Sequence, residues 1–241
     1  STVRGAQLVE AIEAILAETG HAKVNLIGHS QGGLDARVVA HDRPDLVASV
    51  TTLATPHFGT PIADLAVGLV GDPNAQAVVD WLVDQVGYAL WDEYGNETSL
   101  WKPLQLLSQP GIAAFNAQYT DAPGIPYESL SGRSDLELVE AACQPDEHVD
   151  FVDDFDLQLD TIDPLLDATE AIIDGGLLRS DTNDGLVRAI DARWGTFLGC
   201  VPADHLDEIG QLLGDGPGLG NGWKHTDLYR DLVARLRAKG L

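Results

Sequence analysis

The chain has 241 residues and a formal net charge of −24, and 44% of its residues are hydrophobic. This length suits one sizeable domain, and the hydrophobic content excludes a disordered chain. The negative charge argues against nucleic acid and anionic membrane surfaces as partners, because both would repel the protein. No apolar run reaches 18 residues, so we expect no integral membrane segment.

The first quarter of the chain alternates expected helices and strands. Residues 5–19 and 32–40 carry apolar side chains at helical spacing, and residues 24–27 and 47–54 read as short buried strands. Further along, residues 127–131 and 196–201 are expected strands, and residues 227–238 form an expected amphipathic helix. Such an alternation predicts an α/β fold with a mostly parallel sheet and helices on both faces.

Residues 62–107 interrupt this alternation with helical pieces and no convincing strand. The centre of the segment has a broad apolar surface that includes Val78, Trp81, Leu82 and Val86. One interpretation is that this surface packs on the core. The other is a helical lid that covers a site in water and opens at a lipid surface.

The pentapeptide Gly28-His29-Ser30-Gln31-Gly32 matches the G-x-S-x-G pattern, and it falls between an expected strand and an expected helix. In this position a serine is held on a sharp bend, where neighbouring glycines avoid clashes with the adjoining elements. We therefore interpret Ser30 as a nucleophile, with a plain turn as the alternative. The backbone N–H of Gln31, at the helix start, is an expected oxyanion donor.

A serine nucleophile needs a base and an orienting carboxylate, which follow it in the chain order Ser, acid, His. Four of the seven histidines precede residue 60 and lie too early for this order. His205 follows the expected strand at residues 196–201 and is our candidate base, ahead of His225. Asp184 is the candidate acid, with Asp181 of the same turn as the second choice.

These pieces together resemble the calcium-dependent bacterial true lipases of the Pseudomonas and Burkholderia type, which belong to the α/β-hydrolase superfamily. The similar segments run in the family's order with similar separations and are residues 23–33, 47–52, 55–59, 183–187 and 205–214. The resemblance implies an α/β-hydrolase fold in a single domain over residues 1–241, with a lid insertion at about 62–107. It also implies triacylglycerol hydrolysis at a lipid interface, with Ser30 as nucleophile, Asp184 as acid and His205 as base.

The same resemblance implies a structural calcium ion. Its matching ligand positions are the side chains of Asp163 and Asp207 and the backbone carbonyls of Gln211 and Asp215. Calcium accepts such mixtures of carboxylate and carbonyl oxygens. Export from the cell and a dedicated folding chaperone are further implications of the resemblance.

Two departures from the family are visible. The cysteines Cys143 and Cys200 match neither family disulfide position, and they are either one disulfide or two thiols. The chain also has no His-Gly pair, which in the family ends the first strand and supplies a second oxyanion donor. We therefore expect that the chain lacks an N-terminal strand, helix and strand, and that this fragment alone is impaired in activity or stability.

Two other functions stay open at this point. One is a soluble esterase, thioesterase or acyltransferase that uses the same three residues. The other is a non-catalytic binding protein with an α/β-hydrolase-like fold.

Overall fold

The computed structural model describes residues 2–69, 101–134, 141–160, 166–173, 181–210, 216–218 and 220–241. Within these residues, four strands form one sheet in the order β1-β2-β3-β4, and every neighbouring pair is parallel. The strands are β1 (Val24–His29), β2 (Val47–Leu53), β3 (Tyr127–Gly132) and β4 (Thr196–Val201). The predicted parallel sheet is therefore confirmed.

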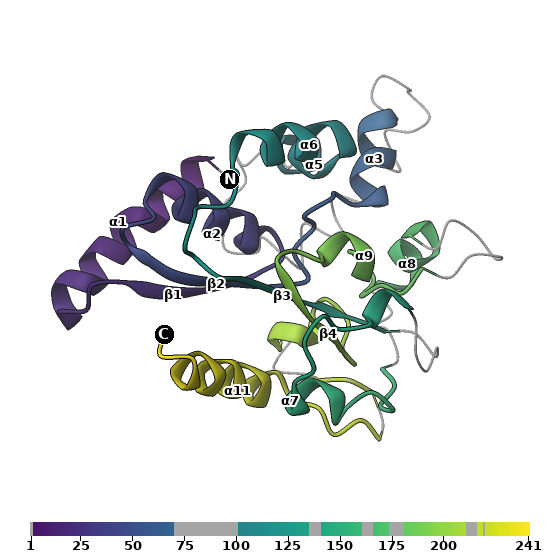
Figure 1. Ribbon diagram of the computed structural model, residues 1–241. Coiled ribbons are helices and arrows are strands. Elements are labelled where there is room, and N and C mark those ends of the chain that lie inside the picture. The colour runs from purple at the N-terminus through teal and green to yellow at the C-terminus, as the bar shows by residue number, and fades with distance from the viewer. Residues whose placement is uncertain are drawn as a thin grey trace.

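Helices lie on both faces of this sheet (Figure 1). On one face are α1 (Thr2–Thr19), α2 (Gln31–Asp42), α3 (Pro61–Gly68), α5 (Trp101–Leu107) and α6 (Gln109–Gln118). On the other are α7 (Asp150–Asp153) and α11 (His225–Ala238). Shorter pieces are η1 (Ala141–Cys143), α8 (Asp167–Ile173), α9 (Ala189–Ala192) and η2 (Asp207–Ile209).

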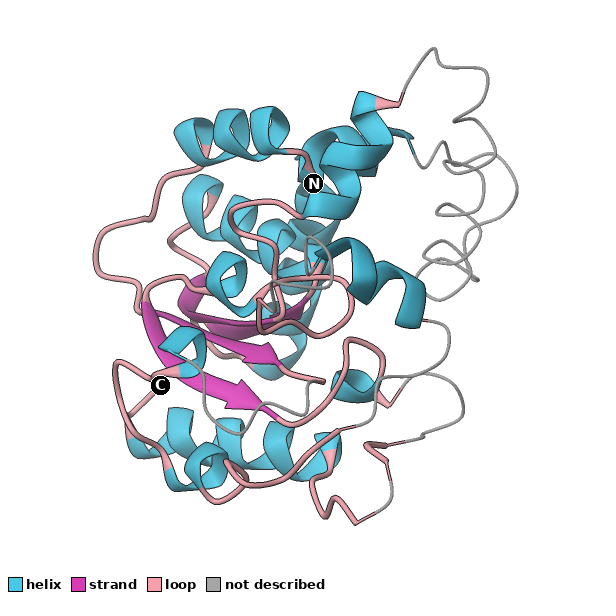
Figure 2. Cartoon of the chain, turned by 90° about the vertical axis from the view of Figure 1, so that its right-hand side faces the viewer, coloured by secondary structure: helices cyan, strands magenta, loops and turns pink. Residues whose placement is uncertain are grey.

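The layered arrangement explains why the central strands are so deeply buried. Six of the seven residues of β2 are buried, since this strand has a strand on each side and helices over both faces. One apolar cluster joins α1, α2 and β2 and includes Ile12, Val39 and Val50. A second cluster joins β3, β4, α7 and α11 on the opposite face. Figure 2 shows the strands between these two helical layers.

An ion-pair network holds α11 against the sheet. The carboxylate of Glu128 in β3 is 7% exposed and lies 2.8 Å from Nη2 of Arg235. Lys239 also donates to Glu128, while the half-exposed Glu147 lies 2.8 Å from Arg235. Burial alone would raise the pKa of Glu128, but the hydrogen bonds from Arg235 and Lys239 outweigh it and hold that pKa below its ordinary value.

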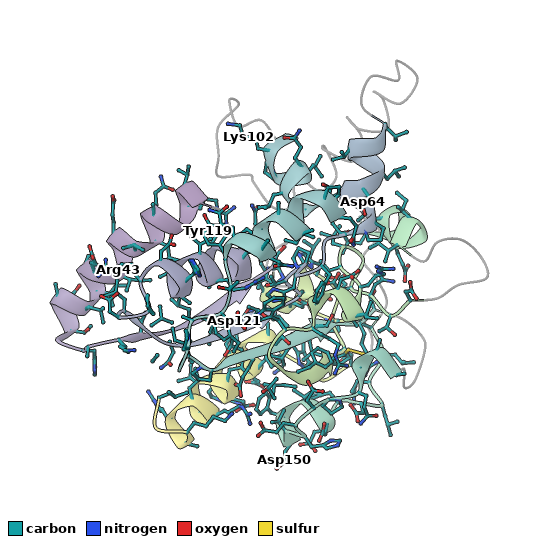
Figure 3. The ribbon with its side chains drawn as sticks, turned by 45° about the horizontal axis from the view of Figure 1, so that its top comes forward. Arg43, Asp64, Lys102, Tyr119, Asp121 and Asp150 are labelled. Carbon is teal, nitrogen blue, oxygen red and sulfur yellow. A yellow bond between two sulfur atoms is a disulfide. The ribbon has the colours of Figure 1, made fainter. Side chains whose placement is uncertain are left out.

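The two cysteines form a disulfide, which decides between the two alternatives that the sequence left open. Cys143 at the end of η1 is bonded to Cys200 in β4, with 5.2 Å between the Cα atoms. The bond links residues 57 apart in the chain, and it is visible in yellow in Figure 3. It ties the segment before α7 to the strand that leads toward His205.

The expected elements match the observed ones to within a few residues at each end, and the strand at 196–201 matches at both ends. Of the expected lid insertion, only α3 and α5 at its two ends are described, so the lid stays a prediction. Val78, Trp81, Leu82 and Val86 lie outside the described residues. No helix in the described ranges is both long and apolar enough to cross a membrane.

Candidate active site

Ser30 occupies a strained bend between β1 and α2. Its φ of 53° and ψ of −133° place a residue with a side chain in a region that normally favours glycine. Two hydrogen bonds of the Ser30 backbone hold the bend. Its N–H donates to Leu53 O at 2.9 Å, and its carbonyl oxygen accepts from Thr55 Oγ1 at 2.8 Å. The serine therefore stands just beyond the carboxyl end of β1, as the motif predicts.

Glycines make this bend possible by allowing close approach of two backbone segments. A Cβ on Gly28 would lie 2.7 Å from Cα of Gly33, and a Cβ on Gly33 would lie 2.0 Å from Oγ1 of Thr55. A Cβ on Gly32 would meet no atom within 4 Å, so a side chain at this position is not excluded by contact. The packing thus assigns the steric need to Gly28 and Gly33, whereas the sequence reasoning placed it on Gly28 and Gly32.

Asp184 and His205 form a buried pair. Nδ1 of His205 lies 2.7 Å from Oδ2 of Asp184, and both side chains are 0% exposed. The other carboxylate oxygen of Asp184 accepts the N–H groups of Leu186 at 2.9 Å and Val187 at 2.6 Å. Backbone donors thus fix the carboxylate in place, and the carboxylate in turn fixes the orientation of the imidazole.

The backbone links the two segments as well. His205 N donates to Asp184 O at 2.9 Å, which joins the loop after β4 to the turn at residues 183–187. Gly185 has a φ of 89°, so this turn requires a conformation that glycine adopts without steric cost. One main-chain and one side-chain hydrogen bond therefore hold the acid, Asp184, next to the base, His205.

Ser30 and His205 line the same cavity, which is partly open to solvent. Apolar side chains make up most of the remaining wall, and those from α3 and α5 include Ile62, Pro103, Leu104 and Leu107. Nε2 of His205 is buried and has no hydrogen-bond partner among the described residues. The cavity is thus bordered by a serine and a histidine and otherwise lined mostly by apolar side chains, which suits an apolar ligand.

Gln31 is the first residue of α2, so its backbone N–H is one of the four that no helical carbonyl can accept. Its side chain is fixed from α1, because Nη1 of Arg4 donates to Gln31 Oε1 at 3.3 Å. Arg4 is itself held by Asp35, at 2.8 Å. The position suits the oxyanion role predicted for the Gln31 N–H.

A second histidine and a glutamate lie beside this pair. The rings of His29 and His205 have centroids 4.5 Å apart, and Nε2 of His29 lies 3.0 Å from Oε2 of Glu208. Burial, followed by the nearby His205, lowers the pKa of His29 well below its usual value. Burial also raises the pKa of Glu208 well above its usual value, and Asp184, Asp204 and Asp207 add to this effect.

Three aspartates form a second buried cluster, and two of them belong to the loop that carries His205. Asp160, Asp204 and Asp207 each offer a carboxylate oxygen, and these atoms lie within 4.8 Å of one another. Asp204 is partly engaged, since its Oδ1 accepts the N–H groups of Leu206 at 2.9 Å and Asp207 at 3.0 Å. Of the predicted calcium ligands, only Asp207 belongs to this cluster and to the described residues; Asp163, Gln211 and Asp215 lie outside them.

The sequence reasoning missed Asp160, Asp204 and Glu208. Asp204 and Glu208 flank the candidate base at positions −1 and +3, and that proximity was the signal available. Asp160 offered no such signal, because it reaches the loop from 45 residues earlier in the chain. His29, one of the four histidines that come too early in the chain to be the base, packs against His205.

Comparison with known proteins places this chain in a family. The family described as the alpha/beta hydrolase fold matches residues 2–84. A triacylglycerol lipase of Vibrio cholerae is 36% identical over 263 aligned positions, which cover 99% of this chain and 73% of the relative. A triacylglycerol lipase of Pseudarthrobacter phenanthrenivorans is 33% identical over 234 positions, covering 88% of this chain and 73% of the relative. The chain belongs to the bacterial triacylglycerol lipase family.

Solved structures support the same fold for this lipase-family chain. The mature form of the Bacillus licheniformis lipase BlEst2 has a TM-score of 0.54 and 22% identity, covering 85% of this chain and 66% of that one. A metagenomic carboxyl esterase has a TM-score of 0.59 and 19% identity, covering 98% of this chain and 63% of that one. The lipase-family chain thus spans about two thirds of the length of these two structures and 73% of the two curated relatives.

Proposed function

We propose that this chain hydrolyses carboxylic esters, with triacylglycerols as the substrate class, through Ser30, His205 and Asp184. The observation that carries the proposal is the placement of His205, whose Nδ1 is held by the buried carboxylate of Asp184 while the imidazole borders the same apolar cavity as Ser30. The apolar wall suits an acyl chain, and the curated relatives named triacylglycerol lipases support the choice of substrate.

In the proposed reaction, Nε2 of His205 takes the proton of the Ser30 hydroxyl as its oxygen attacks the ester carbonyl. The negative charge that develops on the carbonyl oxygen is stabilised by the backbone N–H of Gln31. His205 then gives its proton to the departing alcohol, which leaves an acyl group on Ser30. A water molecule, deprotonated by His205, releases the acid and restores the serine, while Asp184 keeps the imidazole in the required tautomer.

A structural calcium ion is part of the proposal. The described donor set fits calcium, because three buried carboxylates that converge are costly without a cation, and calcium prefers oxygen ligands. Asp160, Asp204 and Asp207 would hold the ion, with Asp204 and Asp207 on either side of His205 in the chain. Its charge would stabilise the loop that carries the base, so we expect a calcium chelator to lower the melting temperature and activity together.

The disulfide supports a further part of the proposal, that the protein works in an oxidising compartment outside the cytoplasm. A dedicated folding chaperone, suggested by the resemblance to the Pseudomonas and Burkholderia lipases, is proposed on that resemblance alone. Co-expression with a candidate chaperone tests it through the yield of soluble, active protein.

Covalent labelling with a fluorophosphonate tests the proposed catalytic serine. We expect rapid labelling of the wild-type chain at Ser30, no labelling of Ser30→Ala, and at least about a hundredfold slower labelling of His205→Ala. A binding protein without a base would react at the background rate in all three. Hydrolysis of p-nitrophenyl esters of increasing chain length, with and without an emulsion, then separates a triacylglycerol lipase from a soluble esterase.

A further inference from the structure

Three residues next to the proposed nucleophile present ligand atoms without well-aligned hydrogen-bond partners. Nε2 of His29, Nε2 of His205 and both carboxylate oxygens of Glu208 are buried, and none has a well-aligned hydrogen-bond partner in the part of the chain that the structure describes. The nearest groups to the Glu208 carboxylate are Nε2 of His29 at 3.0 Å and the backbone of Gly132. The side chains of His205 and Glu208 are 0% exposed, and that of His29 is 11% exposed. Buried polar groups are rarely left in this state without a functional reason.

The spacing of these atoms fits metal coordination better than direct pairing. Each of the three residues offers one ligand atom within 4.8 Å of the other two. Nε2 of His29 and Oε2 of Glu208 are 3.0 Å apart but lack the alignment of a hydrogen bond. In a tetrahedral site with metal–ligand bonds of about 2.0–2.2 Å, ligand atoms lie about 3.4 Å apart, so small shifts would bring all three to one ion.

The surroundings favour a cation. Asp184, Asp204 and Asp207 lie close enough to Glu208 to act on its charge, and each adds negative potential at this point. Glycine at position 132 makes room for the carboxylate, because a Cβ there would lie 2.0 Å from Oε1 of Glu208. His205 is the member of the group that borders the cavity, and this cavity is partly open to solvent.

We propose that His29, His205 and Glu208 form a site for a divalent transition metal of the zinc class, and that occupation of this site inhibits the enzyme. Two imidazoles and one carboxylate are a ligand set that zinc accepts, and imidazole ligands disfavour calcium and magnesium. The site is separate from the cluster of Asp160, Asp204 and Asp207 proposed for calcium. One protein would therefore respond in opposite ways to two ions.

Inhibition follows because His205 is both the proposed base and one of the metal ligands. His205 Nδ1 is engaged by Asp184, so Nε2 is the nitrogen left for the metal. A metal on Nε2 blocks the lone pair that must accept the serine proton. A metal on Nδ1 would instead displace Asp184, with the same consequence. This part of the inference rests on the proposed function, because it assigns proton transfer to His205, whereas the binding of the metal does not.

The test titrates the full chain with zinc chloride while calcium is kept in excess. Binding is measured by calorimetry, and hydrolysis of p-nitrophenyl butyrate is measured at the same zinc concentrations. We expect one binding event in the wild type, with inhibition that follows it. In His29→Gln and in Glu208→Gln, the zinc concentration for half-inhibition should rise at least about tenfold, relative to each variant's own activity without metal.

His148→Gln is the matched control. His148 is an exposed histidine with a carboxylate of Asp153 at 3.1 Å, so it tests whether any histidine and carboxylate pair would serve. We expect it to bind zinc and be inhibited as the wild type is. Equal binding and inhibition in His29→Gln and Glu208→Gln would overturn the inference, as would a wild type without a zinc site.

A measurement on the wild type covers the case in which a variant does not fold. Zinc should shift the imidazole NMR signals of His29 and His205, and unchanged signals at saturating zinc would refute the site. If the wild type binds zinc in this way but hydrolyses no ester, the proposed function fails and the metal site stands. The two proposals can thus fail separately.

Discussion

Replacement of Asp184 by asparagine is the sharpest test of the proposed mechanism. Oδ1 of Asp184 accepts two backbone N–H groups, and Oδ2 accepts Nδ1–H of His205 at 2.7 Å. An asparagine amide that keeps its oxygen on the backbone donors must turn its NH₂ toward Nδ1. The imidazole then adopts the other tautomer, with a proton on Nε2, and it can no longer accept the serine proton.

This geometry predicts a large loss of kcat. A base held in the wrong tautomer costs about 10⁴-fold in kcat in an established serine hydrolase triad, equivalent to about 5 kcal/mol. We expect a similar fall in kcat for ester hydrolysis by Asp184→Asn, with KM changed by less than about threefold because the apolar cavity is untouched. Steady-state kinetics with a short p-nitrophenyl ester measures both, and circular dichroism checks that the variant folds.

Asp181→Asn is the control from the same turn. Asp181 is 46% exposed and pairs with Arg188 at 3.2 Å, so it was a reasonable second candidate from the sequence alone. We expect its kcat to stay within about threefold of the wild type, since an exposed ion pair contributes at most about 1 kcal/mol. A loss below tenfold in Asp184→Asn, or an equal loss in both variants, would refute the assigned role.

Three further predictions concern stability. Gly28→Ala should lower both kcat and the free energy of unfolding, the latter by about 1–3 kcal/mol, because its Cβ would lie 2.7 Å from backbone atoms. Replacement of Cys143 and Cys200 by serine should lower the free energy of unfolding by about 2–5 kcal/mol in urea unfolding. Glu128→Gln should lower the melting temperature at neutral pH but reduce its fall in acid. The pKa of Glu128 is depressed in the folded state, so its ion pairs stabilise the fold above the ordinary glutamate pKa of about 4.3 and are lost as the pH falls through the lowered value.

Two matched control variants test the physical explanations of these predictions. Gly32→Ala should be neutral or slightly stabilising, since a Cβ there meets no atom within 4 Å. Glu147→Gln should change the acid profile less than Glu128→Gln does, because Glu147 is 46% exposed and Glu128 is 7% exposed. If Gly32→Ala is as damaging as Gly28→Ala, the packing argument is wrong. If the melting temperature of Glu128→Gln falls in acid as steeply as that of the wild type, another group controls the acid transition.

The layered α/β arrangement could be predicted because it depends on local patterns. Apolar runs bounded by glycine or proline mark strands such as 47–53, and a parallel sheet places all carboxyl ends at one edge. Ser30 and His205 both follow strands, so their meeting at this edge follows from the topology. Asp184 follows no strand of the sheet, and its selection over Asp181 depended on the resemblance to a known family and on the turn.

Charge clusters assembled from distant segments could not be predicted in the same way. Asp160 meets Asp204 and Asp207 across a sequence separation that carries no local signal. The family resemblance implied Asp163 and Asp207 as calcium ligands, and Asp163 lies outside the described residues. The close approach of His29 and Glu208 is of the same kind, since neither residue carries a signal in its own segment. The disulfide also belongs here, because two cysteines permit either pairing or free thiols until their distance is known.

The amino-acid sequence by itself determined the strands, the helices and the nucleophile bend, because these arise from side-chain periodicity and from glycines at fixed short spacings. The tertiary structure alone decided which carboxylates surround His205, which glycines have no space for a side chain and whether the two cysteines are joined. Those features depend on distances between residues far apart in the chain, and such distances exist only after the sheet has formed and its loops have packed against one another.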